Sequence, residues 1–172
     1  YIMEARRLTK MALLTALLCV SAWISFPLPF SPVPVIALTL VATLTGLMLE
    51  PKDALIVFLV YILLGLIGVP VFAGGTSGLT KLWGPTGGFI VSWPIAYTLL
   101  SVCKGKSRSF FSYAWRSIAI TIPVVYIFGV AGFMLVTGTP LWAALTAAMF
   151  PYIPGDIVKC LVAAWLATKI KI

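Results

Sequence analysis

Apolar residues fill most of the chain in long runs that proline, glycine or basic residues interrupt. Runs of this kind predict membrane-spanning helices, each of which needs roughly 20 mostly apolar residues, or slightly fewer when the flanks are basic. The interruptions divide the chain into six predicted spans, at 8–23, 35–49, 54–69, 88–103, 117–136 and 154–168. The run at 140–150 is too short to cross alone, so we expect a short helix near the surface there.

The composition supports an all-α integral membrane protein. Of the 172 residues, 62% are hydrophobic and 9% are charged, which leaves no room for a soluble domain, so we expect a single membrane domain over 1–172. The chain contains no His, Asn or Gln, which removes most groups used in general-base, metal and oxyanion chemistry. We therefore expect no enzymatic activity, no cofactor and no metal, and three cysteines that act as small core residues.

The basic residues predict the orientation in the membrane, because short cytoplasmic loops retain Lys and Arg. Ten of the twelve fall on one predicted side: Arg6, Arg7, Lys10, Lys52, Lys104, Lys106, Arg108, Arg116, Lys169 and Lys171. Both termini are then cytoplasmic, and the formal charge of +8 reflects topology and contact with membrane lipid, so nucleic acid need not be invoked. Arg6-Arg7 before an apolar run is also compatible with a signal peptide, but no convincing cleavage site follows it.

The longest predicted loop, at 70–88, is rich in glycine and lies on the outer face. It includes Phe72, Gly74, Gly75, Lys81 and Trp83, followed by Thr86. Glycine lets a backbone approach a ligand closely, and irregular backbone near membrane depth is tolerated where it packs against protein or lines a cavity. We expect a lid or cradle that folds back onto an apolar surface. The alternative is a long, flexible surface connection.

The last predicted helix supplies one acid and one base. Asp156 lies near its N-terminus and Lys159 follows one turn later, so the two side chains can be neighbours. A charge at bilayer depth costs roughly 2.5 to 3.5 kcal/mol on insertion scales, which favours a functional role over a simple helix-capping ion pair. With Lys81 as a second donor and Tyr152 beside Phe72 and Trp83 as aromatic walls, the predicted pocket suits a small, flat, partly apolar anion.

Three stretches together resemble one family. "GLIGVPVFAGGTSGLTKLWGPTGGFIVSW" (65–93), "SPVPVIALTL" (31–40) and "PGDIVK" (154–159) resemble the biotin-specific S components (BioY) of energy-coupling factor vitamin transporters. The resemblance implies a high-affinity biotin-binding subunit in the plasma membrane of a prokaryote, which works with a transmembrane coupling protein and two ATPase subunits. It implies that Asp156 accepts from the ureido N–H groups of biotin. Whether Lys159 or Lys81 binds the ureido oxygen, and which binds the carboxylate, stays open at this point.

The resemblance also implies a contact with the coupling protein through Ala12 and Ala16 on the first helix. Small residues four apart let two helices approach closely, although this spacing is common by chance in so apolar a chain. Three other interpretations stay open: an S component for another vitamin such as thiamine or riboflavin, a small membrane enzyme that uses Asp156 and Lys159, and a structural subunit that binds no small molecule.

Overall fold

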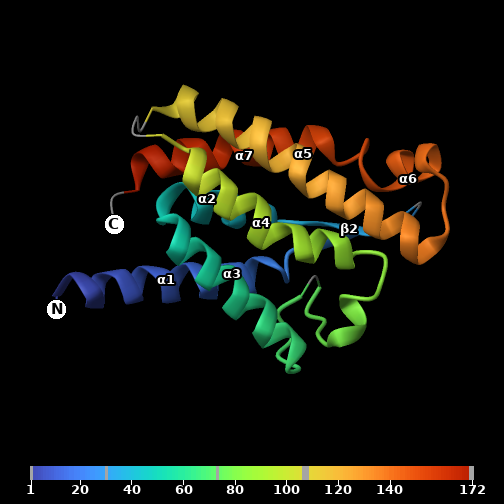
Figure 1. Cartoon of the computed structure of the whole chain (residues 1–172), viewed down its shortest axis with the longest axis horizontal. Coiled ribbons are helices and arrows are strands. Elements are labelled where there is room, and N and C mark those ends of the chain that lie inside the picture. The colour runs from blue at the N-terminus through green and yellow to red at the C-terminus, as the bar shows by residue number, and fades with distance from the viewer. Residues whose placement is uncertain (1, 30, 73, 106–108, 171–172) are drawn as a thin grey trace.

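The chain is almost entirely helical. The computed structural model describes residues 2–29, 31–72, 74–105 and 109–170. In these ranges the elements are α1 (Ile2–Ser21), β1 (Ser25–Leu28), β2 (Ser31–Ile36), α2 (Leu38–Met48), α3 (Pro51–Leu66), the 3₁₀ helix η1 (Leu79–Lys81), α4 (Gly87–Cys103), α5 (Phe110–Thr137), α6 (Leu141–Ala148) and α7 (Ile153–Lys169). The N and C ends lie at one end of the molecule, and the short α6 lies at the other (Figure 1).

Most predicted helices are present, including the short one at 140–150, which is α6. One helix among the described residues, α5, is long and apolar enough to cross a membrane by itself. The pair α6 and α7 meets the same length and composition together, with a bend of 48° between them, whereas α2 and α4 are shorter apolar helices. The fold is therefore confirmed as mostly helical, and the six-span topology stays a prediction.

The second predicted span, 35–49, is wrong at its start. Val35 and Ile36 belong to β2, which pairs with β1 as an antiparallel hairpin that the sequence analysis did not predict. Pro32 and Pro34 explain the extended backbone, since proline lacks a donor and pushes the residue before it out of the helical region. The 11-residue α2 then rises only about 16 Å, against a hydrocarbon core of roughly 30 Å.

Helices α4 and α5 pack together through glycine. A Cβ built on Gly88 would lie 2.3 Å from the carbonyl oxygen of Phe128, and one on Gly132 would lie 2.9 Å from the Cα of Gly88. Distances this short mean that the two backbones touch, as small residues at helix crossings allow. Helix α7 packs against α2 and α5, and Asp156 in its first turn contacts Tyr126 of α5.

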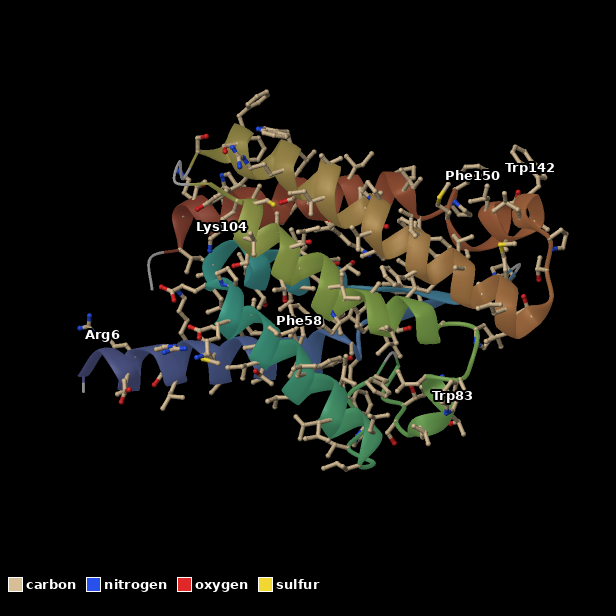
Figure 2. All side chains as sticks on the ribbon, in the orientation of Figure 1. Arg6, Phe58, Trp83, Lys104, Trp142 and Phe150 are labelled. Atoms are coloured by element: carbon tan, nitrogen blue, oxygen red, sulfur yellow. The ribbon has the colours of Figure 1, made fainter. Side chains whose placement is uncertain are left out.

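Basic side chains bind helix ends at the end of the molecule that holds both termini, where Figure 2 shows Arg6 and Lys104. Lys104 donates to the carbonyl oxygens of Leu47 (3.0 Å) and Leu49 (2.6 Å), where α2 ends. Cations stabilise this end of a helix because its carbonyl groups carry partial negative charge. The sequence analysis attributed the basic residues to topology and lipid contact. At least Lys104 also stabilises the fold, because it binds backbone carbonyl groups at a helix end.

Two arginines make similar links at the same end. The Arg7 Nε donates to both carboxylate oxygens of the buried Asp53, at 2.8 and 2.9 Å, which joins α1 to α3. This hydrogen bonding and the charge of Asp53 raise the pKa of Arg7 above its ordinary value. Arg116, on α5, donates to the carbonyl oxygen of Cys103, the last residue of α4. These links tie neighbouring helices together near their ends: α1 to α3, and α4 to α5.

Candidate functional site

The first turn of α7 places Asp156 inside the molecule. The chain enters this helix through Tyr152, whose carbonyl accepts from the Asp156 backbone N–H at 2.9 Å, and Pro154 occupies the first turn, where a missing N–H costs little. The Asp156 side chain is 16% exposed. Its Oδ2 accepts a hydrogen bond from the phenol of Tyr126, which lies on α5.

Lys159 lies one turn further along α7, on the same face. Its Nζ is 3.7 Å from Asp156 Oδ1 and donates to the carbonyl oxygen of Ile36 at 2.7 Å. Ile36 ends β2 immediately before α2 begins, so irregular backbone at the strand-to-helix junction supplies the acceptor. The prediction that the Asp156 and Lys159 side chains are neighbours is confirmed. Lys159 also binds the Ile36 carbonyl, a partner that the local sequence did not indicate.

A small cavity lies beside this pair. Its volume is about 20 Å³, enough for roughly one water molecule. Its polar lining comes from four helices: Thr39 and Thr43 of α2, Tyr97 of α4, Thr121 and Tyr126 of α5, and Asp156 and Lys159 of α7. The thiol of Cys160 also lines it, 3.8 Å from the Thr121 hydroxyl. A ligand larger than water must therefore displace surrounding side chains when it binds here.

The charged pair offers an acceptor and a donor side by side. Asp156 keeps Oδ1 for a further N–H group, and the Lys159 ammonium carries three donors. An amide or urea edge presents the reverse arrangement, an N–H next to a carbonyl oxygen. Hydrogen bonds to ionised groups are shorter and stronger than neutral ones, so the arrangement suits tight binding of a small amide-like ligand.

The predicted lid residues form a second group, packed on α1 and α3. Phe72 is 1% exposed, its ring lies edge-on to Tyr61 at 5.8 Å between centroids, and it covers Gly65. Gly74 donates its backbone N–H to the carbonyl oxygen of Ala22 at 2.8 Å. The loop therefore folds onto apolar neighbours at its start, as expected.

The rest of this loop is more exposed. Gly75 has φ +79° and lies over the ring of Trp23, a close approach that a side chain would obstruct. Lys81 ends η1, and Trp83 is 74% exposed. Thr86 lies at the start of α4, where its carbonyl accepts from Phe89 at 3.1 Å.

Among the described residues that line the cavity, Asp156 and Lys159 are the two that the sequence analysis had proposed as site residues. Tyr152 is buried just before α7, and the roles proposed for it and for the loop stay predictions. Ala12 and Ala16 are both exposed on α1. Sequence reasoning missed Tyr126 and Thr39, which reach the cavity from helices distant in sequence and carry no local signal.

These features define a helical membrane protein with a small cavity lined by hydroxyl groups and one charged pair. No cluster of three or more metal-ligating side chains occurs in the described part of the chain. The chain belongs to the BioY family, whose family model matches residues 2–172. The resemblance seen in the sequence motifs is therefore confirmed, and a family of transporter S components is not one of enzymes.

The relatives extend over nearly the whole chain. A protein from Pyrococcus horikoshii named "Probable biotin transporter BioY" is 32% identical over 169 residues, which cover 98% of both chains. The "Biotin transporter BioY" of Rhodobacter capsulatus is 36% identical over 180 residues, covering 96% of this chain and 93% of the relative. Among solved structures, the S-component for biotin from an ECF-type ABC transporter superposes with a TM-score of 0.92 at 25% identity, covering 98% of this chain and 92% of that one.

Proposed function

We propose that this chain is the biotin-binding S component of an ATP-driven vitamin uptake transporter. It crosses the plasma membrane of a prokaryote six times with both termini inside, captures biotin at the outer face and releases it inward together with a transmembrane coupling protein and two ATPase subunits. The family membership and the relatives named for biotin support this assignment. The observation that carries it is the Asp156–Lys159 pair beside a cavity.

Biotin ends in a cyclic urea, in which a carbonyl oxygen lies between two N–H groups. Asp156 Oδ1 is the proposed acceptor for one N–H, and the Lys159 ammonium is the proposed donor to the oxygen. Lys159 is held between Asp156 and the Ile36 carbonyl. For this reason we assign Lys159 to the ureido oxygen of biotin. Lys81 is then the proposed partner of the valerate carboxylate, so the proposal assigns one lysine to each end of biotin.

The loop that begins at Phe72 is the proposed lid. Gly74 and Gly75 allow its backbone to lie close to the protein surface, while Phe72 anchors it against α3. The exposed indole of Trp83 is free to move onto the apolar part of a ligand. Thr86 at the start of α4 and Tyr152 before α7 are the proposed flanking contacts.

The orientation and the contact with the coupling protein are part of the same proposal. The end that holds both termini and the Arg6 and Lys104 side chains (Figure 2) is the proposed cytoplasmic end. The exposed pair Ala12 and Ala16 on α1 is the proposed contact with the coupling protein, because two small side chains leave room for a second helix.

The test is biotin titrated into detergent-purified protein by calorimetry, beside thiamine and riboflavin. We expect one biotin per chain and no binding of the other two. Asp156→Asn and Lys159→Met each remove a charge-assisted hydrogen bond worth about 1.5 to 3 kcal/mol, which weakens binding roughly 10- to 150-fold. Lys52→Met is the matched control, because Lys52 is an exposed lysine in the first turn of α3 and does not line the cavity. Absence of biotin binding, or equal loss in all three variants, would refute the proposed site.

A further inference from the structure

Thr39 has a buried hydroxyl that the fold does not use. It lies in the first turn of α2 and lines the cavity beside Lys159. Its oxygen is buried and has no hydrogen-bond partner among the residues that the structure describes. Buried hydroxyl groups are nearly always paired in folded proteins, so this one requires an explanation.

The local backbone explains why the group is unpaired. Thr43 and Thr45, further along α2, each donate to the carbonyl four residues earlier, at 2.8 Å. For Thr39 the carbonyl four residues earlier belongs to Val35, which lies in β2 and not in the helix. The helix therefore offers Thr39 no acceptor of the usual kind, and its hydroxyl stays available on the cavity wall.

Three other hydroxyl groups that line the cavity already donate elsewhere. Thr43 and Thr121 donate to backbone carbonyls, and Tyr126 donates to Asp156. Three more buried polar atoms have no partner in the described ranges, on Trp93, Thr98 and Arg116, but none of these residues lines the cavity. An unpaired buried hydroxyl and the cavity coincide at Thr39.

The proposed ligand head has one polar group still without a partner. A cyclic urea carries a second N–H on the far side of its carbonyl oxygen, and Asp156 and Lys159 account for the first N–H and the oxygen. Lys159 contacts Asp156 on α7 and, at 2.7 Å, the carbonyl of Ile36. Ile36 is three residues before Thr39, so the segment whose carbonyl accepts from Lys159 leads directly into the turn that carries this hydroxyl.

We infer that Thr39 is a specificity-determining residue whose hydroxyl accepts the second ureido N–H of the ligand. This inference rests on the proposed biotin-binding function and adds a third polar contact to it. The two N–H groups on either side of the ureido oxygen are then both bound, one by the Asp156 carboxylate on α7 and the other by the Thr39 hydroxyl on α2. A ligand that lacks the second N–H loses this contact and is bound less tightly.

The experiment compares three variants by calorimetry with biotin. Thr39→Val keeps the shape and removes the hydroxyl, and Thr39→Ser restores the hydroxyl on a smaller side chain. Thr98→Val is the matched control, because it removes another buried unpaired hydroxyl that lies outside the cavity. A neutral hydrogen bond corresponds to about a three- to tenfold change in affinity, so we expect that loss in Thr39→Val, near-normal binding in Thr39→Ser and no change in Thr98→Val.

A second readout separates recognition from packing. Biotin methylated on one ureido nitrogen is titrated into wild type and Thr39→Val, with each of the two N-methyl isomers. We expect wild type to discriminate against both isomers and Thr39→Val to lose the discrimination against one of them. Unchanged biotin affinity in Thr39→Val, or equal weakening in Thr98→Val, overturns the role of Thr39 while Asp156→Asn still tests the proposed function. Failure of wild type to bind biotin overturns both.

Discussion

Replacing Gly88 by alanine should destabilise the protein through a direct clash between α4 and α5. The added Cβ would lie 2.3 Å from the Phe128 carbonyl oxygen and 3.1 Å from the Gly132 Cα. Ordinary van der Waals contact begins near 3.4 Å, so the two helices must separate by about 1 Å at this point. Because both neighbours are backbone atoms, no side chain can rotate away to relieve the overlap.

The magnitude follows from two opposing effects. Overpacking a well-packed contact costs about 1 to 3 kcal/mol, and alanine regains at most about 1 kcal/mol over glycine in a helix. A rigid backbone on both sides places the clash near the upper end, which leaves a net loss of about 2 kcal/mol. For a chain of this length that corresponds to a fall in Tm of roughly 4 to 8 °C.

The assay is thermal unfolding in detergent, monitored by the reaction of a fluorescent maleimide with the buried Cys160, in a background in which the partly exposed Cys19 and Cys103 are replaced by serine. Gly155→Ala is the matched control: a Cβ there meets nothing within 4 Å, so we expect an unchanged or slightly higher Tm. Gly132→Ala should resemble Gly88→Ala, and the double variant should lose less than the sum because both changes open the same contact. Equal Tm values for Gly88→Ala and Gly155→Ala would refute direct backbone contact between α4 and α5.

Two further predictions concern hydrogen bonds. Lys104→Met removes the ammonium that binds the end of α2, and we expect Tm to fall by about 2 to 4 °C for a loss near 1 kcal/mol, measured by the same unfolding assay; no change, with Lys52→Met also neutral, would contradict the capping role. Tyr126→Phe removes the phenol that donates to Asp156, and we expect biotin affinity to weaken about three- to tenfold by calorimetry with Tm nearly unchanged; unaltered affinity would show that this bond does not position the carboxylate.

The helices could be predicted because each apolar run keeps its character over many residues. The hairpin could not, since the segment from Pro27 to Pro34 is indistinguishable from a loop by composition, and pairing of β1 with β2 decides its conformation. Alternation of proline with valine over 32–35 was the available signal, and only its last residue, Val35, lay inside the second predicted span. Local pattern therefore located the helices and misplaced the start of α2.

Part of the candidate site could also be predicted from the sequence, and part could not. Asp156 and Lys159 could be paired from the sequence because a three-residue spacing on a helix brings two side chains together. The Tyr126 phenol, the Ile36 carbonyl and the Thr39 hydroxyl come from 30 to 123 residues away, so only the packing of α7 against α2 and α5 brings them to the pair. Thr39 is also one of many threonines, and its unpaired hydroxyl depends on where α2 begins.

The links made by Arg7, Lys104 and Arg116 have a mechanical consequence. They fasten neighbouring helices together at the end that holds both termini, whereas α7, whose first turn carries Asp156, begins at the end where α6 lies (Figure 1). Side chains can rearrange around an incoming ligand there while the fastened end stays shut. In the proposed function, a carrier built in this way would load biotin at one end without opening a continuous path to the other, so the ion gradients of the membrane would survive each round of capture.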